Sequence, residues 1–311
     1  MNILYLTQFF DPEPTFIGIN FVKELISYGH HVDVLTGYPN YPEGKIYNGY
    51  RLRLRQVEYM DGVKIVRIPL FPSHNRSAIQ RILNYTSFGF SAATIGQFCN
   101  KKHDIIFCYN LPTLGWASSL FRLFRRSKIV VTVQDLWPES VMESGMLKNN
   151  FLNKILTRQC NKFYKKMDGL MVLSSGFKEN LIKRGVKSER IEVIHNWCNE
   201  KSMRIAQVQK RTQEQAFTIL FAGNMGIGQA LETVIEAALR LKNQNKNIRF
   251  RLIGPGVKVN ELKNRATELK LNNIEFMPPI PMNEISSEYD KSDALLIHLK
   301  DTKLFEITIP S

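Results

Sequence analysis

Short apolar runs rich in β-branched residues alternate with amphipathic stretches along the whole of this sequence. Runs such as NILYL and KIVVTV have the length and composition of buried strands, and the stretches between several of them have the apolar period of helices. This alternation is typical of parallel sheets that are covered by helices on both faces. The sequence therefore predicts an α/β fold built from doubly wound parallel sheets.

Strands are predicted in the first half over residues 2–6, 31–37, 63–68, 104–109, 128–133, 169–173 and 191–195. Helices are expected near residues 18–28, 78–98 and 150–166. The segment YPNYPEGKIYNGYRLR carries too many turn residues for a strand or a helix. We expect it to form an excursion at the edge of the sheet.

Residues 199–216 are polar and lack apolar strands, so we interpret them as a linker. A second series follows, with strands over residues 217–223, 248–254, 274–278 and 294–299 and helices near 230–242, 257–269 and 283–289. The predicted organisation is a Rossmann-like domain over residues 1–198 and a second, incomplete one over 217–311. We expect a ligand in the cleft between them, outside the carboxyl ends of both sheets.

The composition is that of a globular protein, because 44% of the 311 residues are hydrophobic and 23% are charged. The four cysteines have no paired short spacing, which predicts isolated buried thiols in a reducing compartment. The amino terminus has no cationic leader, and no run reaches the roughly 18–20 apolar residues of a membrane span. We therefore expect a cytoplasmic protein whose first residues form a strand.

The net charge of +14 raises the question of an acidic partner. One dense cluster contains Arg122, Arg125, Arg126 and Lys128, and its cations alternate with the apolar residues 121, 123 and 124. This pattern favours peripheral contact with an anionic membrane, at about 1 kcal/mol for each cation near the surface. A solvated basic face is the alternative. No recognition motif for nucleic acid is found.

Candidate functional residues follow the predicted strands. The closely spaced glycines of a dinucleotide dehydrogenase are absent after the first strand. Gly18 lies there at the start of a helix. Its surroundings either bind a phosphate or sugar oxygen, or the glycine simply starts the helix. Asp135 follows the strand at 128–133 and precedes a Trp-Pro turn. We expect its carboxylate to hold a sugar hydroxyl or to stabilise positive charge at a reacting carbon, with a structural turn as the alternative. Glu139 is a weaker candidate that favours a helix start.

Asn196 lies at the end of the last strand before the linker, where its amide can orient a ligand or hold a hinge. His195 has no second metal ligand nearby in the sequence, so we expect a packed histidine and no metal site.

Two glycine turns follow neighbouring strands of the second domain. Gly223, Gly226 and Gly228 precede an amphipathic helix, and Gly254 and Gly256 lie in the next crossover. Glycines at these places let a diphosphate approach the backbone and the amino end of a helix. Together the two turns suggest a nucleotide.

Taken in order, the segments DLWPES, HNW, FAGNMGIGQALETVIEAA, RLIGPG, EFMPPIPMNEI and FEITIPS resemble the WbuB-like branch of family 4 glycosyltransferases, which are retaining enzymes of the GT-B fold. The resemblance runs over the whole chain. It implies transfer from a nucleotide sugar, such as the UDP derivative of an N-acetylated 6-deoxyhexose, to an undecaprenyl-diphosphate-linked or oligosaccharide acceptor. O-antigen or capsule biosynthesis at the inner face of the plasma membrane is the implied setting, with no metal and no other cofactor.

The resemblance also assigns roles by position. The Gly18 loop and Asp135 would flank the transferred sugar, and Glu306 matches the first of two paired glutamates, which contacts hydroxyls of the donor sugar. The implied mechanism is transfer with retention, in which the bond from the anomeric carbon to phosphate breaks and helix amino ends stabilise the charge.

The remaining positions concern the nucleotide. Gly223 and Asn224 would lie beside the diphosphate, and Gly254 with the turn that contains Pro279 would border the nucleoside. Many family members carry arginine and lysine in the phosphate turn where this chain has Asn224. The cation that the leaving group needs is therefore either Lys300 or a lysine expected beyond the last residue of the sequence.

The chain ends with LFEITIPS, which we interpret as a strand-like run. The second glutamate of the paired motif is expected beyond it, so we expect a truncated donor site and weak or no turnover. A nucleotide-sugar epimerase of the same fold is one alternative function. An inactive membrane-associated remnant is another.

Overall fold

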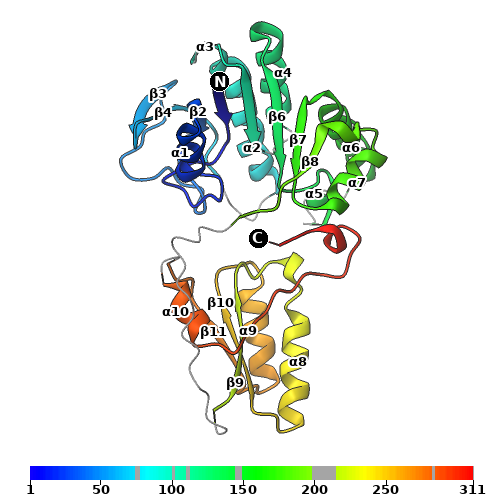
Figure 1. Cartoon of the computed structure of the whole chain (residues 1–311). Coiled ribbons are helices and arrows are strands. Elements are labelled where there is room, and N and C mark those ends of the chain that lie inside the picture. Colours follow the sequence, from blue (N-terminus) through cyan, green and yellow to red (C-terminus); the bar gives the residue numbers. More distant parts are fainter. Residues whose placement is uncertain are drawn as a thin grey trace. The chain divides into compact units, whose positions relative to one another are not determined.

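The computed structural model describes residues 1–73, 78–99, 102–109, 113–143, 149–197, 215–281 and 284–310. The chain forms two compact units, Met1–His195 (unit 1) and Asn196–Ser311 (unit 2), and each is described here by itself (Figure 1). The linker predicted at 199–216 lies almost wholly outside the described residues.

Unit 1 contains an eight-stranded sheet with the strand order β3-β4-β2-β1-β5-β6-β7-β8. Its strands are β1 Asn2–Leu6, β2 His31–Gly37, β3 Gln56–Met60, β4 Val63–Ile68, β5 Ile105–Tyr109, β6 Lys128–Val133, β7 Gly169–Val172 and β8 Ile191–Val193. Neighbouring strands pair in parallel, except that the edge strand β3 pairs antiparallel with β4. The predicted α/β class and its parallel sheet are confirmed.

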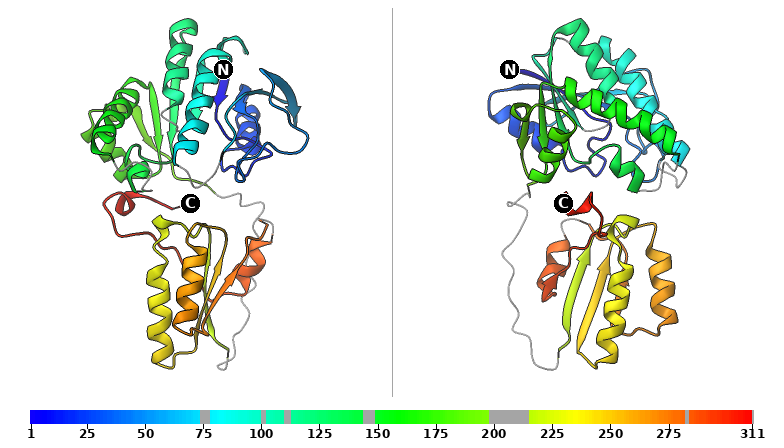
Figure 2. Two further views of the ribbon diagram at one scale, coloured as in Figure 1. Left: turned by 180° about the vertical axis from the view of Figure 1, so that it is seen from behind. Right: turned by 90° about the vertical axis from the view of Figure 1, so that its right-hand side faces the viewer.

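The helices of unit 1 are α1 Ile19–Ser27, α2 Ala78–Thr94, α3 Gly96–Cys99, α4 Leu114–Arg125, α5 Glu139–Glu143, α6 Asn150–Lys166 and α7 Ser175–Lys183. The chain moves toward one edge of the sheet from β1 to β4 and toward the other edge from β5 to β8. Because crossovers between parallel strands are right-handed, α1 covers one face of the sheet and α2, α4 and α6 cover the other. The right-hand view of Figure 2 shows these two layers.

Unit 2 contains a four-stranded parallel sheet with the order β11-β10-β9-β12. Its strands are β9 Phe217–Ala222, β10 Ile248–Ile253, β11 Ile274–Met277 and β12 Ala294–Leu295, and its helices are α8 Glu232–Asn243, α9 Val259–Glu268 and α10 Ile285–Asp290. Two 3-10 turns, η3 Ile227–Gln229 and η4 Phe305–Ile307, complete the unit. A core of buried residues from β9, β10, α8 and α9 holds the sheet and the helices together.

A buried arginine fixes the loops that leave the first strands of unit 1. Arg67 on β4 is fully buried, and its Nε donates to a carboxylate oxygen of Glu58 at 2.6 Å. Its Nη atoms donate to the carbonyl oxygens of Gly37, at 3.0 Å, and of Asp11. Because a buried guanidinium needs partners for its charge, this cluster holds the carboxyl ends of β1, β2 and β4 at one place.

The structure differs from the sequence-based expectations in several elements. Strand β3 and helices α4 and α7 were not predicted, and the expected helix at 78–98 is divided at Ile95 into α2 and α3. The last residues do not form a strand as predicted. The N–H of Glu306 donates to the carbonyl of Thr302 at 2.9 Å, and the hydroxyl of Thr308 donates to the carbonyl of Leu304 at 2.8 Å. The 3-10 turn itself is closed by the N–H of Ile307, which donates to the Leu304 carbonyl at 3.4 Å, and by the N–H of Thr308, which donates to the Phe305 carbonyl at 3.2 Å.

Within the described residues, no helix is long and apolar enough to cross a membrane. The two described cysteine side chains, Cys108 and Cys160, are free and buried, as predicted. Burial raises the pKa of Cys160 to about 12.

Candidate functional site

Asp135 lies two residues beyond the carboxyl end of β6, on the edge of the sheet where ligands bind in open α/β folds. The side chain keeps access to solvent. Burial by the surrounding protein nevertheless raises the pKa of its carboxyl group. A carboxylate with a raised pKa is a stronger proton acceptor than an ordinary aspartate, which suits a group that binds a hydroxyl.

Tyrosines from three other elements lie around Asp135 and were not predicted from the sequence. Burial raises the pKa of Tyr109 at the end of β5. The Asp135 carboxylate and the neighbouring phenols of Tyr41 and Tyr85, which disfavour a second negative charge, raise it further. Burial likewise raises the pKa of Tyr85 on α2, where the Arg81 guanidinium opposes the shift and Asp135 adds to it. The phenols therefore stay protonated at neutral pH. They offer O–H groups and ring faces beside a carboxylate.

Arg81 on α2 introduces a cation at this edge. Its charge lowers the pKa of Tyr85, which places the guanidinium close to that ring. Its Nε is buried and has no hydrogen-bond partner among the described residues. A buried N–H group without a partner is unusual, because most buried polar groups are bonded.

Buried polar side chains hold the loops that carry these tyrosines. The two carboxylate oxygens of Glu13 accept the N–H groups of Asn40, at 2.7 Å, Tyr41, at 2.8 Å, and Phe10, at 3.2 Å. Burial raises the pKa of Glu13 in spite of these bonds. The loop after β1 is thereby tied to the loop after β2, and Tyr41 is held at the strand ends.

The turn after Asp135 is fixed by α7. The Trp137 carbonyl accepts a hydrogen bond of 2.7 Å from Nη1 of Arg184, whose Nη2 donates to Glu139. The Trp137 ring meets the Tyr85 ring edge to face, with centroids 6.3 Å apart. Glu139 is the first residue of α5, so it serves the helix start and the ion pair.

Gly18 is the N-cap of α1, as its place at the helix start predicted. The carboxylate of Asp11 accepts the N–H of Ile19 at 2.7 Å. A Cβ on Gly18 would lie 2.4 Å from Oδ2 of Asp11. A glycine is therefore required here so that Asp11 can reach the helix end. The role of Gly18 toward the transferred sugar stays a prediction.

The two glycine turns of unit 2 pack on each other. Gly254 has φ +137°, and a Cβ there would lie 2.0 Å from the carbonyl oxygen of Gly223. Gly256 has φ +155°, and a Cβ there would lie 2.2 Å from the carbonyl oxygen of Met225. The N–H of Met225 in turn donates to the Pro255 carbonyl at 2.6 Å. Neither glycine of the second turn can carry a side chain without moving the first.

Parts of the first glycine turn already have partners. The N–H of Gly223 donates to the Ile253 carbonyl at 2.9 Å, and the N–H of Gly226 donates to Oε1 of Gln229 at 3.1 Å. Helix α8 begins with Glu232, whose carboxylate lies 3.0 Å from Nζ of Lys258. The Glu232 carboxylate at the amino end of α8 repels a second anion there. An anion is therefore better accommodated at the glycine turn than at this helix end, and Asn224 in that turn is exposed.

The last described segment returns to this turn. The N–H of Lys300 donates to the Gly228 carbonyl at 2.8 Å, and Nδ1 of His298 donates to the Gln229 carbonyl at 2.7 Å. A Cβ on Gly228 would lie 2.9 Å from the Phe305 ring. The structure thus brings the segment that carries Lys300 and Glu306 to the glycine turn after β9. The Glu306 side chain is exposed.

Gly254 also lies beside the end of β11, because its N–H donates to the Met277 carbonyl at 3.3 Å. The exposed Pro279 follows two residues after Met277.

Asn196 is half-buried. His195 is exposed rather than packed, and its Nδ1 donates to the Leu173 carbonyl at 2.7 Å. Among the described residues, no group of three or more His, Cys, Asp or Glu side chains is placed to hold a metal ion.

The basic cluster of residues 122–128 is less open than its sequence suggested. Arg122 donates to the Lys166 carbonyl at 2.5 Å and to the Asp168 carboxylate. Arg125 donates to the Gln97 carbonyl and lies 5.0 Å from the centroid of the Phe121 ring, which is buried. Arg126 and Lys128 are exposed. Of the three apolar residues in the cluster, the first belongs to the core and the other two face solvent.

Comparison with known proteins agrees with this arrangement. Residues 20–197 match the model of the glycosyl transferase 4-like domain, and residues 203–301 match glycosyl transferases group 1. The putative colanic acid biosynthesis glycosyl transferase WcaI of Escherichia coli K12 is 26% identical over 317 residues, which cover 95% of this chain and 74% of that protein. The probable glycosyltransferase WbjE of Pseudomonas aeruginosa is 27% identical over 222 residues, 68% of this chain and 54% of that protein.

Solved structures show the same fold. Sucrose-phosphate synthase from Thermosynechococcus elongatus has a TM-score of 0.64 and 14% identity, over 95% of this chain and 75% of that one. Anabaena HepE in complex with UDP and glucose has a TM-score of 0.58 and 13% identity, over 94% of this chain and 73% of that one. These likenesses show an α/β fold of the GT-B kind, in which the second unit of this chain is the shorter.

Proposed function

We propose that this chain transfers a sugar from a nucleotide sugar to an acceptor in bacterial surface polysaccharide biosynthesis. The chain belongs to the family of the glycosyl transferase 4-like domain, whose model matches residues 20–197. The name of WcaI, a putative colanic acid biosynthesis glycosyl transferase, supports this setting, and the name of WbjE supports glycosyl transfer. We place the chain in the WbuB-like branch. O-antigen or capsule is the proposed product, and an undecaprenyl-diphosphate-linked or oligosaccharide chain is the proposed acceptor.

The donor is a UDP-sugar bound by unit 2. One observation carries this assignment: the hydrogen bond from Lys300 to the Gly228 carbonyl brings the segment of Glu306 against the glycine turn after β9. The diphosphate then lies at Gly223 and Asn224, with Lys300 as its cation, and the glutamate accepts hydrogen bonds from donor-sugar hydroxyls. The HepE complex with UDP and glucose supports UDP as the nucleotide.

The acceptor is held by unit 1. The Asp135 carboxylate accepts a hydrogen bond from the acceptor hydroxyl, and the surrounding tyrosines bind further hydroxyls and pack on sugar rings. In the reaction, the bond from the anomeric carbon to the diphosphate oxygen breaks and its electron pair leaves with the UDP. The acceptor oxygen forms the new bond on the same face, and its proton passes to the departing phosphate. No metal takes part in the proposed reaction.

A lipid-linked acceptor places the enzyme at the inner face of the plasma membrane. The exposed cations Arg126 and Lys128 support attraction to an anionic leaflet.

The first test of this function is donor binding by the purified chain, measured by calorimetry with UDP and with UDP-sugars. We expect Glu306→Gln to weaken binding of a UDP-sugar by about tenfold while binding of UDP itself changes little, because the carboxylate contacts only the sugar. Glu268→Gln on α9 is the matched control, since among the described residues the Glu268 carboxylate makes an exposed ion pair with Arg265 and no other. Equal UDP-sugar affinity in Glu306→Gln and the parent chain would contradict the assigned role.

The second test is turnover with radiolabelled UDP-sugar, with and without a lipid-linked acceptor. A transferase incorporates label only when the acceptor is present. Interconversion of the donor sugar without acceptor would identify an epimerase. Binding of neither UDP nor any UDP-sugar by folded protein would refute the proposed function.

A further inference from the structure

Helix α2 carries an apolar stripe on the side that faces away from the sheet. Ile79, Leu83 and Phe90 are exposed along it, and Phe90 keeps 68% of its surface open. The two threonines of the stripe turn their hydroxyls inward, since Thr86 donates to the Ile82 carbonyl at 2.7 Å and Thr94 to the Phe90 carbonyl at 2.8 Å. The outer side of α2 therefore presents few polar groups to water.

The stripe continues onto α3 and α4. Phe98 on α3 is 89% exposed, and Leu123 and Phe124 on α4 are each 71% exposed. Helix α2 packs closely on the start of α4, because a Cβ on Gly89 would lie 2.7 Å from the carbonyl oxygen of Thr113. These elements form one surface, on the side of the sheet opposite α1 (Figure 2). Large exposed aromatic side chains gathered on one face mark an interaction site.

Cations surround the apolar tip of this surface. A hollow of about 440 Å³ is lined by Lys102, Phe124, Arg125 and Arg126. No acidic residue occurs between Asp61 and Asp104, and none occurs between Asp104 and Asp135. Among the described residues, Lys102 and Arg126 make no ion pair. The partner of this surface must therefore supply the negative charge.

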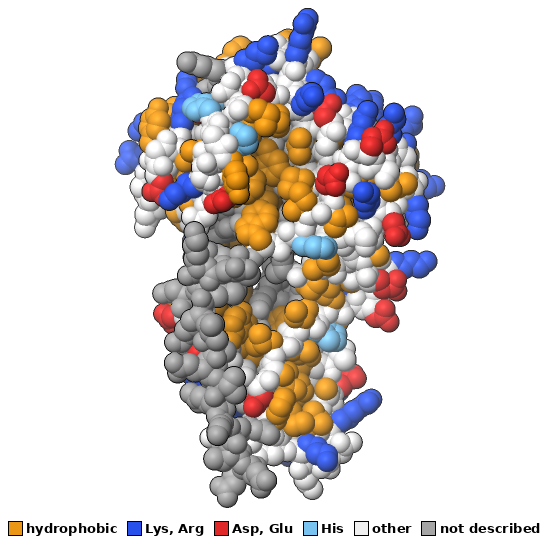
Figure 3. All heavy atoms as spheres, viewed as in Figure 1, with side chains coloured by type: hydrophobic (Ala, Val, Ile, Leu, Met, Phe, Trp, Pro, Cys, Tyr) orange, Lys and Arg blue, Asp and Glu red, His pale blue; other side chains and the backbone are white. Residues whose placement is uncertain are grey.

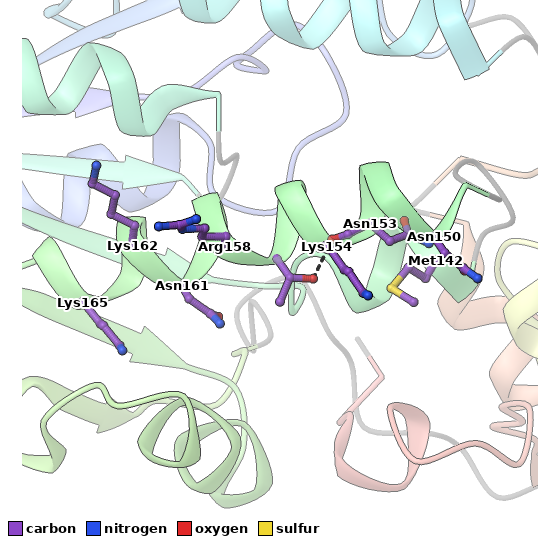
Figure 4. A pocket seen from close by; sticks show the side chains of 9 residues that line it. Met142, Asn150, Asn153, Lys154, Arg158, Asn161, Lys162 and Lys165 are labelled. Carbon is purple, nitrogen blue, oxygen red and sulfur yellow. Dashed lines mark hydrogen bonds between the residues drawn. The ribbon is translucent and has the colours of Figure 1, made fainter.

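Helix α6 adds a second row of cations. Lys154, Arg158, Lys162 and Lys165 line a shallow hollow of about 830 Å³ along it (Figure 4). Like charges four residues apart destabilise a helix, and α6 contains no acidic residue to offset them. Some exposed cations elsewhere are paired, as Arg265 and Lys291 are with glutamates three residues away. Helix α6 offers its cations no such partner within the helix.

Helices α4 and α6 lie side by side. A Cβ on Gly115 of α4 would lie 2.4 Å from the ring of Phe163 on α6. The exposed side of α6 also carries Phe151 and Ile155. In Figure 3, Lys and Arg side chains gather along the rim of unit 1 over α4, α6 and α7. The layer of α2, α3, α4 and α6 thus combines exposed apolar side chains with positively charged ones.

We propose that the outer surface of this layer, called the α2–α6 face below, docks on an anionic lipid bilayer. Phe98, Leu123 and Phe124 insert at the level of the headgroups, where aromatic and aliphatic side chains leave water. Lys102 and Arg126 then bind lipid phosphates, and the α6 row lies along the charged surface. The inference rests on the proposed membrane location of the enzyme, and it names the surface and the inserted residues.

A bilayer fits this face better than a protein partner does. Phe98 and Leu123 project from helices, and Phe124 stands beside the hollow that cations also line. The row of cations on α6 has no carboxylate within that helix. A protein partner of comparable area normally meets charges of both signs with a polar rim. A fluid anionic surface needs neither a matched shape nor alternating charges.

The test is sedimentation with phosphatidylcholine vesicles that contain or lack phosphatidylglycerol. We expect binding only to the anionic vesicles, and weaker binding as salt is added. The double variant Phe98→Ser and Phe124→Ser should weaken binding by at least about tenfold, because two aromatic side chains no longer insert. Lys102→Glu with Arg126→Glu should weaken it further at low salt.

Two variants serve as matched controls. Tyr28→Ser removes an aromatic side chain that is 73% exposed at the end of α1, on the other side of the sheet. Lys263→Glu reverses an exposed charge on α9 of unit 2. Both should bind anionic vesicles as the parent chain does. Circular dichroism checks that every variant is folded.

Equal sedimentation of the parent chain and the Phe98/Phe124 variant would overturn the proposal. Concentration-dependent dimerisation that the same variant abolishes would instead make this face a contact between protein chains. UDP binding, which belongs to unit 2, is measured on the same samples. A variant that binds UDP but not vesicles separates membrane docking from the proposed transfer function.

Discussion

The backbone N–H of Lys300 donates a hydrogen bond of 2.8 Å to the carbonyl oxygen of Gly228. These residues are far apart in the sequence, yet the bond sets the last described segment against the turn that follows β9. Phe305 packs against the same glycine. The consequence is that the two halves of the proposed donor site, the glycine turn and the segment of Glu306, form one surface of unit 2.

Substitution of Gly254 by alanine should destabilise unit 2. The residue has φ +137°, and the new Cβ would lie 2.0 Å from the Gly223 carbonyl oxygen. We expect a loss of at least about 2 kcal/mol in the free energy of unfolding. Gly29→Ala separates strain from collision, because Gly29 has φ +81° with no atom within 4 Å. It should cost about 1 kcal/mol. Urea unfolding measures both, and equal losses would contradict the assigned collision.

Asp135→Asn should lower activity and raise stability. Burial raises the pKa of this carboxyl, so between its ordinary and its raised pKa the folded chain binds more protons than the unfolded chain. Stability therefore increases as the pH falls through that window, and the uncharged asparagine should stabilise the protein at neutral pH. Urea titrations at several pH values check this, and a variant less stable than the parent at neutral pH would contradict it.

The rate of sugar transfer should fall in acid for the same reason. Protonation of Asp135 removes the acceptor of the hydroxyl hydrogen bond, and the raised pKa moves this loss to a higher pH than an ordinary aspartate would show. Asp135→Asn should reduce kcat/KM by about 10- to 100-fold, as expected for the loss of one hydrogen bond to a charged group, and leave a flat acid limb. An acid limb of unchanged position in the variant would assign the titration to another group.

Tyr109→Phe and Tyr85→Phe should each raise the KM for the acceptor by about two- to tenfold, as expected for one lost hydrogen bond. Because the rings remain, stability should change little. Tyr59→Phe on the edge strand β3 is the control, since its ring is exposed far along the sheet from β6. A rise in the KM for the donor with no change for the acceptor would place these phenols at the donor sugar.

Arg81→Gln should weaken binding of an anionic acceptor more than binding of a neutral oligosaccharide. The buried Nε of Arg81 has no hydrogen-bond partner among the described residues, and its charge acts on Tyr85. A diphosphate would supply both the missing acceptor and the opposite charge. Acceptor affinities measured for the two ligands across a salt series test this. Equal losses for both would show that Arg81 serves only to hold Tyr85.

The parallel strands of both units could be located from the sequence because a buried parallel strand is a continuous apolar run, whereas the antiparallel edge strand β3 was not predicted. β1, β2, β4 and β6 begin and end where predicted. Helix α4 was not predicted, because its closely spaced cations are typical of a surface segment. In the structure Phe121 lies in the core, and Arg122 and Arg125 bond to neighbouring elements. The sequence shows which residues are charged but not which partners their charges meet.

Some residues of the candidate site could likewise be predicted from the sequence, and others could not. Asp135 and the glycine turns were identified by their position after strands, a property of the chain itself. Tyr85 and Arg81 were missed because they lie within a helix that only folding brings to the end of β6, and Lys300 reaches Gly228 only through tertiary packing. Local sequence therefore determined the parallel strands, the fold class and the turn residues. Tertiary structure alone decided which side chains share a surface and which charges remain unpaired, because those properties depend on contacts between segments distant in the chain.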